Sequence, residues 1–438
     1  MAEAPHSYSI GDLRLGVASA AVQIEGGDRN NSWYDWAQVP GRIADGSTPL
    51  RATDHWNRWR EDTDLMASLG IRTSRMGLEW ARIEPRKGEF DEEAIAHYRE
   101  ELAYLRERGI TPLVTLHHFS NPSWFEADGA FTRSGSVDAF LRYVRVVVEG
   151  LGDLVDEWVT INEPNVYATG GYLFGEFPPG VKSYRMLRTV LRNLAIAHCR
   201  AYPLIHDLRP GPATKVGFAH HVRVFDPLDR RNPVHRTLAR TNAYLFQDAL
   251  ADAMLGGAFG RVLGGQPSEV TPGPHYDYLG INYYSRTAVS KMADGTFPGV
   301  PVTDLGWEIY PEGIVAVAAA LYARYPGPIW VTENGTCDNT DRFRARYLHE
   351  HLAAIARSSL PFERYYHWCF VDNWEWALGE VPRFGLVALD YETQQRTVKD
   401  SGRFYAEVIA EGGVTPELYD RYVAAQSYQV QAHPSPRG

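Results

Sequence analysis

The chain has few cysteines, few lysines and no long apolar run. Only three of its 438 residues are cysteines, Cys199, Cys337 and Cys369, and they lie far apart without the spacing of a metal site. This pattern suits a reducing compartment and argues against a disulfide scaffold. No stretch approaches the roughly 18 apolar residues of a membrane helix, and residues 1–9 do not resemble a signal peptide. We therefore predict a cytoplasmic protein with no membrane partner.

Lysine is scarce among the basic residues, and acidic residues are in excess. Five of the 44 basic residues are lysines, and 54 acidic residues bring the formal net charge to −10. The acidic balance excludes an overall basic nucleic-acid-binding protein. None of the lysines lies in the apolar setting that Schiff-base chemistry needs. Aromatic residues are abundant, with 12 Trp, 25 Tyr and 17 Phe, which favours an aromatic core or a bound flat, polar molecule.

Short strand-like segments alternate with amphipathic helical segments along the chain. The predicted strands are residues 13–19, 72–76, 111–117, 157–162, 215–221, 276–284, 328–333 and 365–371. The predicted helices between them include residues 53–69, 92–108, 136–150, 184–208, 242–255 and 341–358. Alternation of this kind favours an all-parallel sheet, and the first strand lacks the glycine-rich turn of a dinucleotide-binding fold.

Eight such units predict a single (β/α)8 TIM barrel, with the active site at the C-terminal ends of the strands. No linker rich in proline, glycine and serine divides the chain. We predict one domain over residues 1–425 and a mobile tail over residues 426–438.

Two glutamates end strands of the predicted barrel. Glu163 follows Asn162 and precedes Pro164, and Glu333 lies two residues before Gly335. In a barrel both would reach the same rim. Two carboxyl groups facing each other across a pocket are what cleavage of an acetal linkage requires, one as a proton donor and the other as a nucleophile or a base. Their separation sets the stereochemical outcome and cannot be obtained from the sequence.

The segments Thr160-Ile-Asn-Glu-Pro164 and Val331-Thr-Glu-Asn-Gly335 resemble the paired signatures of glycoside hydrolase family 1, the retaining β-glycosidases. The resemblance extends from about residue 15 to about residue 399. Further segments that look like the family occur in the family's order at residues 21–26, 54–56, 61–62, 79–85, 115–118, 279–284, 306–313, 372–376 and 383–386. A single segment would be weak evidence, but the ordered set is specific.

The resemblance implies that Glu163 is the general acid and base and Glu333 the nucleophile. Glu333 is expected to be ionised, with Arg75 as its counter-charge and a hydrogen bond from Tyr284. Glu163 is expected to hold a proton at rest, in a setting that raises its pKa until Glu333 is glycosylated. Asn282 is expected to support the two carboxyl groups.

The resemblance also implies a set of sugar-binding residues: Gln23, His118, Asn162, Tyr284, Trp368, Glu375 and Trp376. Gln23 and Glu375 would accept hydrogen bonds from ring hydroxyls, and Trp368 would form an aromatic floor. His117 is expected to be a core histidine. Since a carboxylate at Glu375 would repel a phosphate and no lysine follows Trp376, we predict a neutral sugar.

Some positions depart from the family pattern. Phe119 stands where a tryptophan is common, which removes an indole N–H, and Met76-Gly77 replaces the common Phe-Ser. We predict glucose as the preferred sugar, and galactose or fucose is the alternative. The site for the leaving group is expected from loops at residues 167–180, 220–226 and 291–307, whose aromatic side chains suit either an apolar guest or core packing.

Two other functions were weighed against this one. A metal-dependent barrel hydrolase is suggested by histidines near strand ends, although their spacing matches no ligand motif. These histidines are His55, His117, His118, His220 and His221. A non-catalytic sugar-binding barrel is the second alternative. We expect no cofactor, no metal and no nucleic-acid partner, and a small-molecule β-glycoside as substrate; the oligomeric state is left open.

Overall fold

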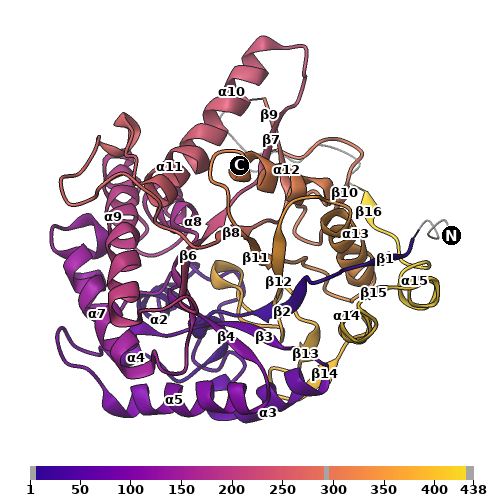
Figure 1. The fold of residues 1–438 in the computed structure, drawn as a ribbon, viewed down its shortest axis with the longest axis horizontal. Coiled ribbons are helices and arrows are strands. Elements are labelled where there is room, and N and C mark those ends of the chain that lie inside the picture. Colours follow the sequence, from indigo (N-terminus) through magenta and orange to yellow (C-terminus); the bar gives the residue numbers. More distant parts are fainter. Residues whose placement is uncertain (1–5, 291–294, 431–438) are drawn as a thin grey trace.

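A computed structural model describes residues 6–290 and 295–430 of the chain. Eight parallel strands close into a barrel at its centre, in the order β11, β12, β2, β3, β4, β5, β6, β8 (Figure 1). Their bounds are β2 (Arg14–Ala18), β3 (Thr73–Gly77), β4 (Thr111–His117), β5 (Glu157–Asn162), β6 (Lys215–His221), β8 (Leu279–Asn282), β11 (Ile329–Asn334) and β12 (Phe362–Trp368). The predicted single (β/α)8 barrel is confirmed.

The strands lie close to their predicted positions, and β4, β5 and β6 have the predicted bounds. The last barrel strand, β12, begins earlier than predicted, because Phe362 pairs with Ile329 of β11. Charged residues concealed this start in the sequence. Arg364 donates to Glu157 of β5 over 2.8 Å, so a cation and an anion neutralise each other inside the barrel at this end.

Helices surround the strands, as Figure 1 shows. The longer ones are α3 (His55–Ser68), α5 (Glu92–Glu107), α7 (Ser136–Leu151), α9 (Tyr184–Leu208), α10 (Pro233–Ala243), α11 (Ala249–Gly256), α12 (Glu312–Tyr322), α13 (Arg344–Ala356) and α14 (Asp400–Glu411). Among the described residues, no helix has the length and apolar character that a membrane crossing requires.

The helix predicted over residues 242–255 has the wrong start. Helical backbone begins at Pro233 and runs through α10 and η3 (Tyr244–Asp248) into α11. The side chain of Asn232 accepts a hydrogen bond from the backbone N–H of Val234, and Pro233 occupies the first helical position. Asparagine followed by proline is typical of a helix start, so the sequence already marked this boundary. The predictions also omitted α12 and α14.

Short elements occupy the connections between strands and helices. The helical ones are α1 (Ala21–Ile24), α2 (Ser32–Ala37), α4 (Trp80–Ile83), α6 (Ser123–Ala127), η1 (Ala130–Thr132), α8 (Pro164–Thr169), η2 (Gly170–Phe174), η4 (Arg261–Leu263), η5 (Trp376–Leu378) and α15 (Pro416–Tyr422). Two-stranded sheets pair β7 (Val224–Pro227) with β9 (Arg286–Val289) and β13 (Val387–Leu389) with β14 (Arg396–Val398).

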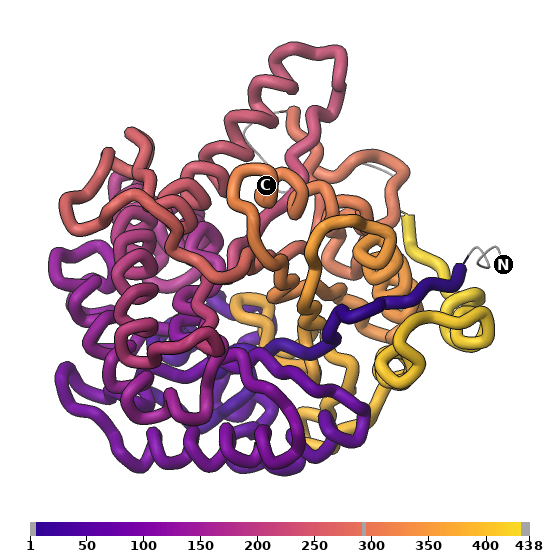
Figure 2. The backbone as a smooth tube through the Cα atoms, viewed as in Figure 1, coloured from indigo at the N-terminus to yellow at the C-terminus, as the bar shows by residue number. Residues whose placement is uncertain are grey.

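The N-terminal and C-terminal parts of the chain lie side by side, as the indigo and yellow segments of Figure 2 show. There β1 (Tyr8–Ser9) pairs antiparallel with β15 (Gly413–Val414). Both ends of the domain are therefore held by one small sheet outside the barrel.

The first residues of the predicted tail contact distant elements. The Gln426 side chain accepts a hydrogen bond from the Arg346 backbone N–H over 2.8 Å. Beyond it, β16 (Gln429–Val430) pairs antiparallel with β10 (Pro301–Val302). The rest of the predicted tail, residues 431–438, lies outside the described residues.

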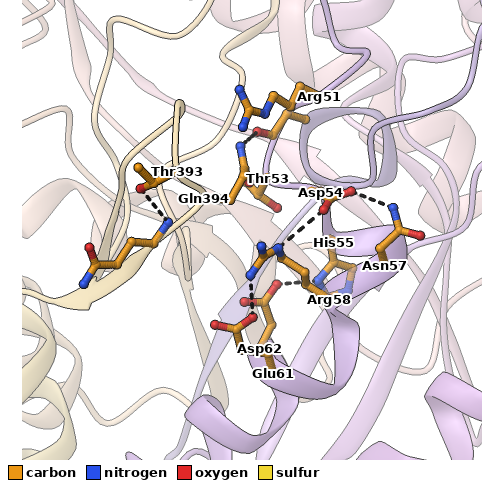
Figure 3. Close-up of polar contacts among 12 residues, drawn as sticks. Arg51, Thr53, Asp54, His55, Asn57, Arg58, Glu61, Asp62, Thr393 and Gln394 are labelled. Carbon is orange, nitrogen blue, oxygen red and sulfur yellow. Dashed lines mark hydrogen bonds and ion pairs between the residues drawn. The ribbon is translucent and has the colours of Figure 1, made fainter.

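Polar contacts hold the start of α3 (Figure 3). Asp54 has a left-handed φ of 53° and accepts a hydrogen bond from Asn57 over 2.7 Å. Arg58 reaches back to Asp54 over 3.4 Å. Further along the helix, Arg396 of β14 donates to Asp62 over 2.9 Å. These contacts tie the first outer helix to a hairpin near the end of the chain.

Candidate active site

Both glutamates lie at the C-terminal end of the barrel and are buried. Glu333 belongs to β11, in register with Asn282 of β8. Glu163 directly follows β5, with a left-handed φ of 40°, and Pro164 opens α8. A non-glycine residue in this conformation is strained, and such strain persists where the surrounding structure holds the residue in place. The chain therefore turns sharply just where it presents the Glu163 side chain.

Glu333 is held by a cation and a phenol. Arg75 donates to its Oε1 over 2.5 Å, and the Tyr284 hydroxyl donates to its Oε2 over 2.7 Å. Arg75 has no exposed side-chain surface. Each carboxylate oxygen thus has one donor, and a buried positive charge faces the negative one. This arrangement orients the carboxylate and supports its ionised form.

Glu163 is held by two donors that reach the same oxygen. His221 Nδ1 lies 2.9 Å and Asn282 Nδ2 lies 3.0 Å from Glu163 Oε1. His221 is the last residue of β6. The second carboxyl oxygen, Oε2, is left available for a proton, so the two glutamates have different surroundings.

Amide side chains join the two carboxyl groups into one network. Arg75 donates from Nη2 to Asn162 Oδ1 over 2.7 Å, and Asn282 donates to the same oxygen over 3.0 Å. Since Asn162 Oδ1 accepts both of these bonds, the other end of the amide, Nδ2, faces His118 and donates to its Nε2, 2.9 Å away. Thr332 in turn donates to Asn282 Oδ1 over 2.7 Å. The network fixes the orientation of each amide.

Burial and nearby groups shift the pKa values of the two glutamates in opposite directions. Burial raises the pKa of Glu333 to about 7, although Arg75 opposes the shift and the charge of Glu163 adds to it. Burial also acts to raise the pKa of Glu163, but His221, Asn282 and Arg75 together outweigh it and leave that pKa below its ordinary value. The two groups therefore titrate as a pair.

Five side chains form one wall of the pocket beside Glu333. The Gln23 amide donates to Glu375 Oε2 over 3.1 Å. The His118 ring centroid lies 5.7 Å from that of Trp368 and 5.7 Å from that of Trp376. These residues come from the connections after β2 and β4, from the end of β12 and from the connection after β12. The predicted sugar-binding set is therefore gathered around one space.

A glycine allows the end of β11 to approach this wall. A Cβ atom added to Gly335 would lie only 2.0 Å from the Trp368 carbonyl oxygen. Any larger residue would push apart the strand end that carries Glu333 and the strand end that carries Trp368. The Glu-Asn-Gly order is thus explained by packing as well as by chemistry.

Two buried polar atoms in this wall have no hydrogen-bond partner within residues 6–290 and 295–430. They are Gln23 Oε1 and His118 Nδ1. Since His118 Nε2 accepts from Asn162, the neutral ring carries its proton on Nδ1. One atom is an acceptor and the other a donor, which is the pair of functions that a sugar hydroxyl supplies. Buried polar groups are normally satisfied, so both atoms are suited to a polar ligand.

Glu375 has no cation against its carboxyl group among its hydrogen bonds in the described structure. Burial raises the pKa of Glu375 to about 8, with the hydrogen bond from Gln23 opposing the shift. The raised pKa weakens the expected repulsion of a sugar phosphate at neutral pH. The prediction of a neutral sugar then depends on the sequence after Trp376, where Ala377, Leu378 and Gly379 offer no basic side chain.

The glutamates open into a cavity of about 730 Å³, within the range of small-molecule sites. Its inner part is lined by His118, Glu163, Tyr284, Glu333, Trp368, Glu375 and Trp376. Gln23, Arg75, Asn162 and Asn282 lie behind these as hydrogen-bond partners. Phe119, whose ring centroid lies 5.1 Å from that of Trp376, also lines the cavity. We call the lining by Arg42, Phe174, Glu176, Phe177, Lys182, Arg223, Trp307, Leu378 and Phe384 the outer cavity.

The outer cavity draws on each of the loops predicted for the leaving group. Phe174 and Phe177 come from the first loop, Arg223 from the second and Trp307 from the third. The Phe174 side chain is 55% exposed, so it is not core packing. Residues 291–294 of the third loop lie outside the described residues.

The contact of His221 with Glu163 was missed, and so was the contact of Arg223 with His221. The sequence places both residues in a predicted loop of the leaving-group site, and His221 is among the candidate metal ligands. Its position at the C-terminal end of a barrel strand was an available signal, because that end carries the site in this fold. Which strand end faces which glutamate depends on barrel geometry, however, and that could not be obtained from the sequence.

The histidines that suggested a metal site have other partners. His55 lies between Asp62 and Glu101, at 2.7 Å and 2.9 Å. Burial would lower the pKa of His55, but Glu101 and Asp62 raise it to about 10, so both ring nitrogens are used as donors to these carboxylates. His117 contacts Asn121 over 2.9 Å. Within the described ranges, no group of three or more His, Cys, Asp or Glu residues is arranged to hold a metal ion.

Comparison with known proteins places this site in a known context. Residues 10–414 match the family described as glycosyl hydrolase family 1. β-Glucosidase A of Thermotoga maritima is 31% identical over 91% of this chain and 97% of its own length. A β-galactosidase of Saccharolobus solfataricus is 29% identical over 94% of this chain and 96% of its own.

A solved structure agrees with these sequence relatives. The β-glucosidase from Thermotoga maritima in complex with glucoimidazole superposes with a TM-score of 0.85 and 30% identity. The match covers 92% of this chain and 99% of that one. The similarity thus includes the whole barrel and the connections that carry the cavity.

Proposed function

Because the chain belongs to glycosyl hydrolase family 1, we propose that Glu333 and Glu163 hydrolyse a terminal, non-phosphorylated β-linked sugar from an aryl, alkyl or short oligosaccharide glycoside. The reaction is that of a retaining β-glycosidase. The observation that supports the residue roles is the unequal setting of the two buried carboxyl groups. Arg75 and Tyr284 each hold one oxygen of Glu333, whereas both donors to Glu163 hold the same oxygen.

In the first displacement Glu333 attacks the anomeric carbon while Glu163 gives its proton to the glycosidic oxygen. The bond to the leaving group breaks, the leaving group departs as an alcohol, and a glycosyl ester of Glu333 forms. A glycosidic oxygen beside Glu163 accepts a hydrogen bond only from the protonated acid. Bound substrate therefore favours the reactive arrangement, in which Glu163 is protonated and Glu333 is ionised.

In the second displacement Glu163 acts as a base. Formation of the ester removes the negative charge of Glu333, so the carboxylate of Glu163 is no longer destabilised by its neighbour. Glu163 takes a proton from water, the water oxygen attacks the anomeric carbon, and Glu333 leaves as a carboxylate. Arg75 and Tyr284 stabilise the departing negative charge. Two inversions at one carbon give net retention.

Glucose is the proposed sugar. Gln23 Oε1 and His118 Nδ1 offer an unused acceptor and an unused donor, and Trp368 supplies a flat face for the C–H side of a pyranose. Galactose or fucose is the second candidate, since one relative is named a β-galactosidase and Phe119 offers no indole N–H to discriminate between epimers.

The test is hydrolysis of an aryl β-D-glucoside followed by NMR of the first sugar product. We expect β-glucose to appear first and to mutarotate afterwards. Glu333→Ala is expected to reduce turnover by about 10⁴-fold or more, since the covalent route is lost. A matched control is Glu149→Gln, on the exposed face of α7, where Glu149 forms an ion pair with Arg145. A first product with inverted configuration, or near-normal turnover in Glu333→Ala, would refute the assignment.

The role of Glu163 has its own test. Glu163→Ala with an activated aryl leaving group should form the glycosyl ester and then stall, because the ester lacks a base for the attacking water. Azide needs no base, so it should restore turnover and yield a β-glycosyl azide. In Glu333→Ala, any azide product should have the α configuration, because azide would enter from the side of the missing carboxylate in a single displacement. A failure of azide to act on Glu163→Ala would contradict the role of this residue.

Two further proposals concern the domain organisation and the location of the protein. We propose that residues 1–425 act as one catalytic domain, whose described part is a single barrel. A cytoplasmic location is supported by the three cysteines, each of which is buried and free of a disulfide.

A further inference from the structure

His221 connects the acid/base glutamate to a second basic side chain. Its Nδ1 lies 2.9 Å from Glu163 Oε1, and its Nε2 lies 3.0 Å from Arg223 Nη2. A guanidinium group has only N–H donors, so Nε2 of His221 accepts. The single proton of the neutral ring is then on Nδ1, from which it is donated to Glu163. The three residues form a chain with one consistent direction of donation.

We propose that His221 and Arg223 are positioning residues for Glu163: Arg223 holds His221 as a neutral imidazole with its proton on Nδ1, and His221 in turn sets the orientation and the proton affinity of Glu163. The inference rests on the proposed function and deepens it. Neither residue needs to touch the reacting atoms for this role.

The orientation follows from the donors. His221 and Asn282 both donate to Oε1 of Glu163, which leaves Oε2 to carry the acidic proton. A carboxyl group held at one oxygen has its proton-bearing oxygen in a defined place. Asn282 is fixed by Thr332, and His221 is fixed by Arg223. Loss of either donor would let the group rotate.

Aromatic rings and charged groups enclose the His221 ring. The ring stacks on that of Tyr284, with centroids 6.0 Å apart and 16° between the planes, and meets Phe246 edge-on at 5.8 Å. The titratable and charged groups that face Glu163 or His221 from the packed elements are Arg75 of β3, His220 of β6, Arg223, Tyr284, Glu333 of β11 and Glu375.

Arg75 contacts Glu333, and Arg223 contacts His221, which in turn contacts Glu163. Each glutamate is therefore influenced by a different cation. Arg75 acts directly, whereas Arg223 acts through a neutral ring. Protonation of His221 at Nε2 would remove the atom that accepts the hydrogen bond from Arg223. It would also place a second cation beside the guanidinium group. Arg223 therefore opposes that protonation.

The charge of His221 matters because Glu163 and Glu333 share one proton. A cationic His221 would stabilise the carboxylate of Glu163 and send the proton to Glu333, where it disables the nucleophile. A neutral His221 supplies a hydrogen bond without that charge. The pair with Arg223 thus keeps Glu163 able to hold a proton at the pH at which Glu333 is ionised.

The test compares pH profiles of kcat/KM for an aryl β-D-glucoside. His221→Phe keeps a ring of similar shape but removes the donor to Glu163. We expect its alkaline limb to move up by roughly one pH unit, because a lost hydrogen bond to the carboxylate makes Glu163 a weaker acid. His221→Gln retains an N–H donor and should lie closer to the wild type.

Arg223 is tested in two backgrounds. Arg223→Met should move the acid limb up by roughly one unit, since His221 becomes free to take a second proton. Arg223→Lys keeps a charge and an N–H donor and should restore the profile. In the His221→Phe background, Arg223→Met should have no further effect on the acid limb, because Arg223 acts through His221.

Several outcomes would overturn the inference in an active enzyme. One is an equal loss of rate at every pH in His221→Phe, which would indicate packing alone. Another is an Arg223→Met shift that persists in the His221→Phe background. A third is the Nε2–H tautomer or a cationic ring at neutral pH in ¹⁵N-histidine NMR, with His221→Phe used to assign the signal. If the wild type hydrolyses no β-glycoside, the proposed function fails, and the NMR result still reports whether Arg223 sets the tautomer.

Discussion

Replacing Glu375 with glutamine is expected to stabilise the protein while impairing sugar binding. Glu375 is enclosed beside Gln23, and the other two glutamates of the site raise its pKa further. The folded protein therefore binds a proton that the unfolded chain has already lost at neutral pH. Glutamine has nearly the shape of the protonated acid and carries no proton to lose. It should remove this cost and leave the packing unchanged.

The size of the effect follows from the two pKa values. The pKa of Glu375 is about 8 in the folded protein and 4.5 in its ordinary setting. Because the folded value is the higher one, the fold loses stability as the pH rises from about 4.5 to about 8. At pH 7 the cost is roughly 3 kcal/mol, from about 1.36 kcal/mol per unit over about 2.5 units. Contact with the open cavity reduces it toward about 1 kcal/mol.

The assay is thermal unfolding of wild type and Glu375→Gln between pH 4.5 and pH 8. An unfolding entropy of about 2.1 cal/mol/K per residue means that 1 kcal/mol shifts Tm by about 1 °C in a chain of this length. We expect the two Tm values to coincide near pH 4.5 and to separate by about 1–3 °C at pH 7. Glu149→Gln, on the protein surface, is the control and should follow the wild type.

A Tm difference that is constant with pH, or one that favours the wild type at pH 7, would refute this reasoning. The same variant should show a higher KM for aryl β-D-glucosides, because an amide replaces an acceptor for sugar hydroxyls. Stability and activity are therefore expected to change in opposite directions, as is common where a buried ionisable group serves function.

Three further predictions address the site. Arg75→Met should lower kcat/KM at pH 7 by about 50-fold. Loss of the cation should raise the pKa of Glu333 by about two units from about 7, which cuts the ionised fraction from one half to about one hundredth. A pH profile that is not displaced to higher pH would contradict this prediction. Phe119→Trp should raise the ratio of glucoside to galactoside kcat/KM several-fold, because the indole supplies an N–H donor to the sugar. The Phe119 ring centroid lies 5.1 Å from that of Trp376, within the sugar pocket. An unchanged ratio in parallel assays would argue against this prediction. Dialysis against a chelator should leave the rate of hydrolysis unchanged, since both steps use carboxyl groups alone, and a loss that added metal restores would show otherwise.

Much of the fold and the reaction could be predicted from local sequence. Eight apolar segments with helices between them indicate a barrel whatever the details of packing, because each strand must be covered on both faces. Strand ends are visible as changes from apolar to polar residues, so Glu163 and Glu333 could be assigned to one rim. Helix starts were less clear, and the one at Pro233 was missed although Asn232 and Pro233 mark it.

What the tertiary structure alone decided is which side chains meet. Barrel closure brings β6 beside β5 and β8, so His221 and Asn282 meet Glu163, and no spacing along the chain expresses that meeting. Proton affinities depend on burial and on charges a few ångströms away, which the sequence does not express. The sequence by itself determined the barrel and the chemical groups at its rim. Their protonation, and the part of His221 and Arg223 in it, followed only from distances in the folded protein.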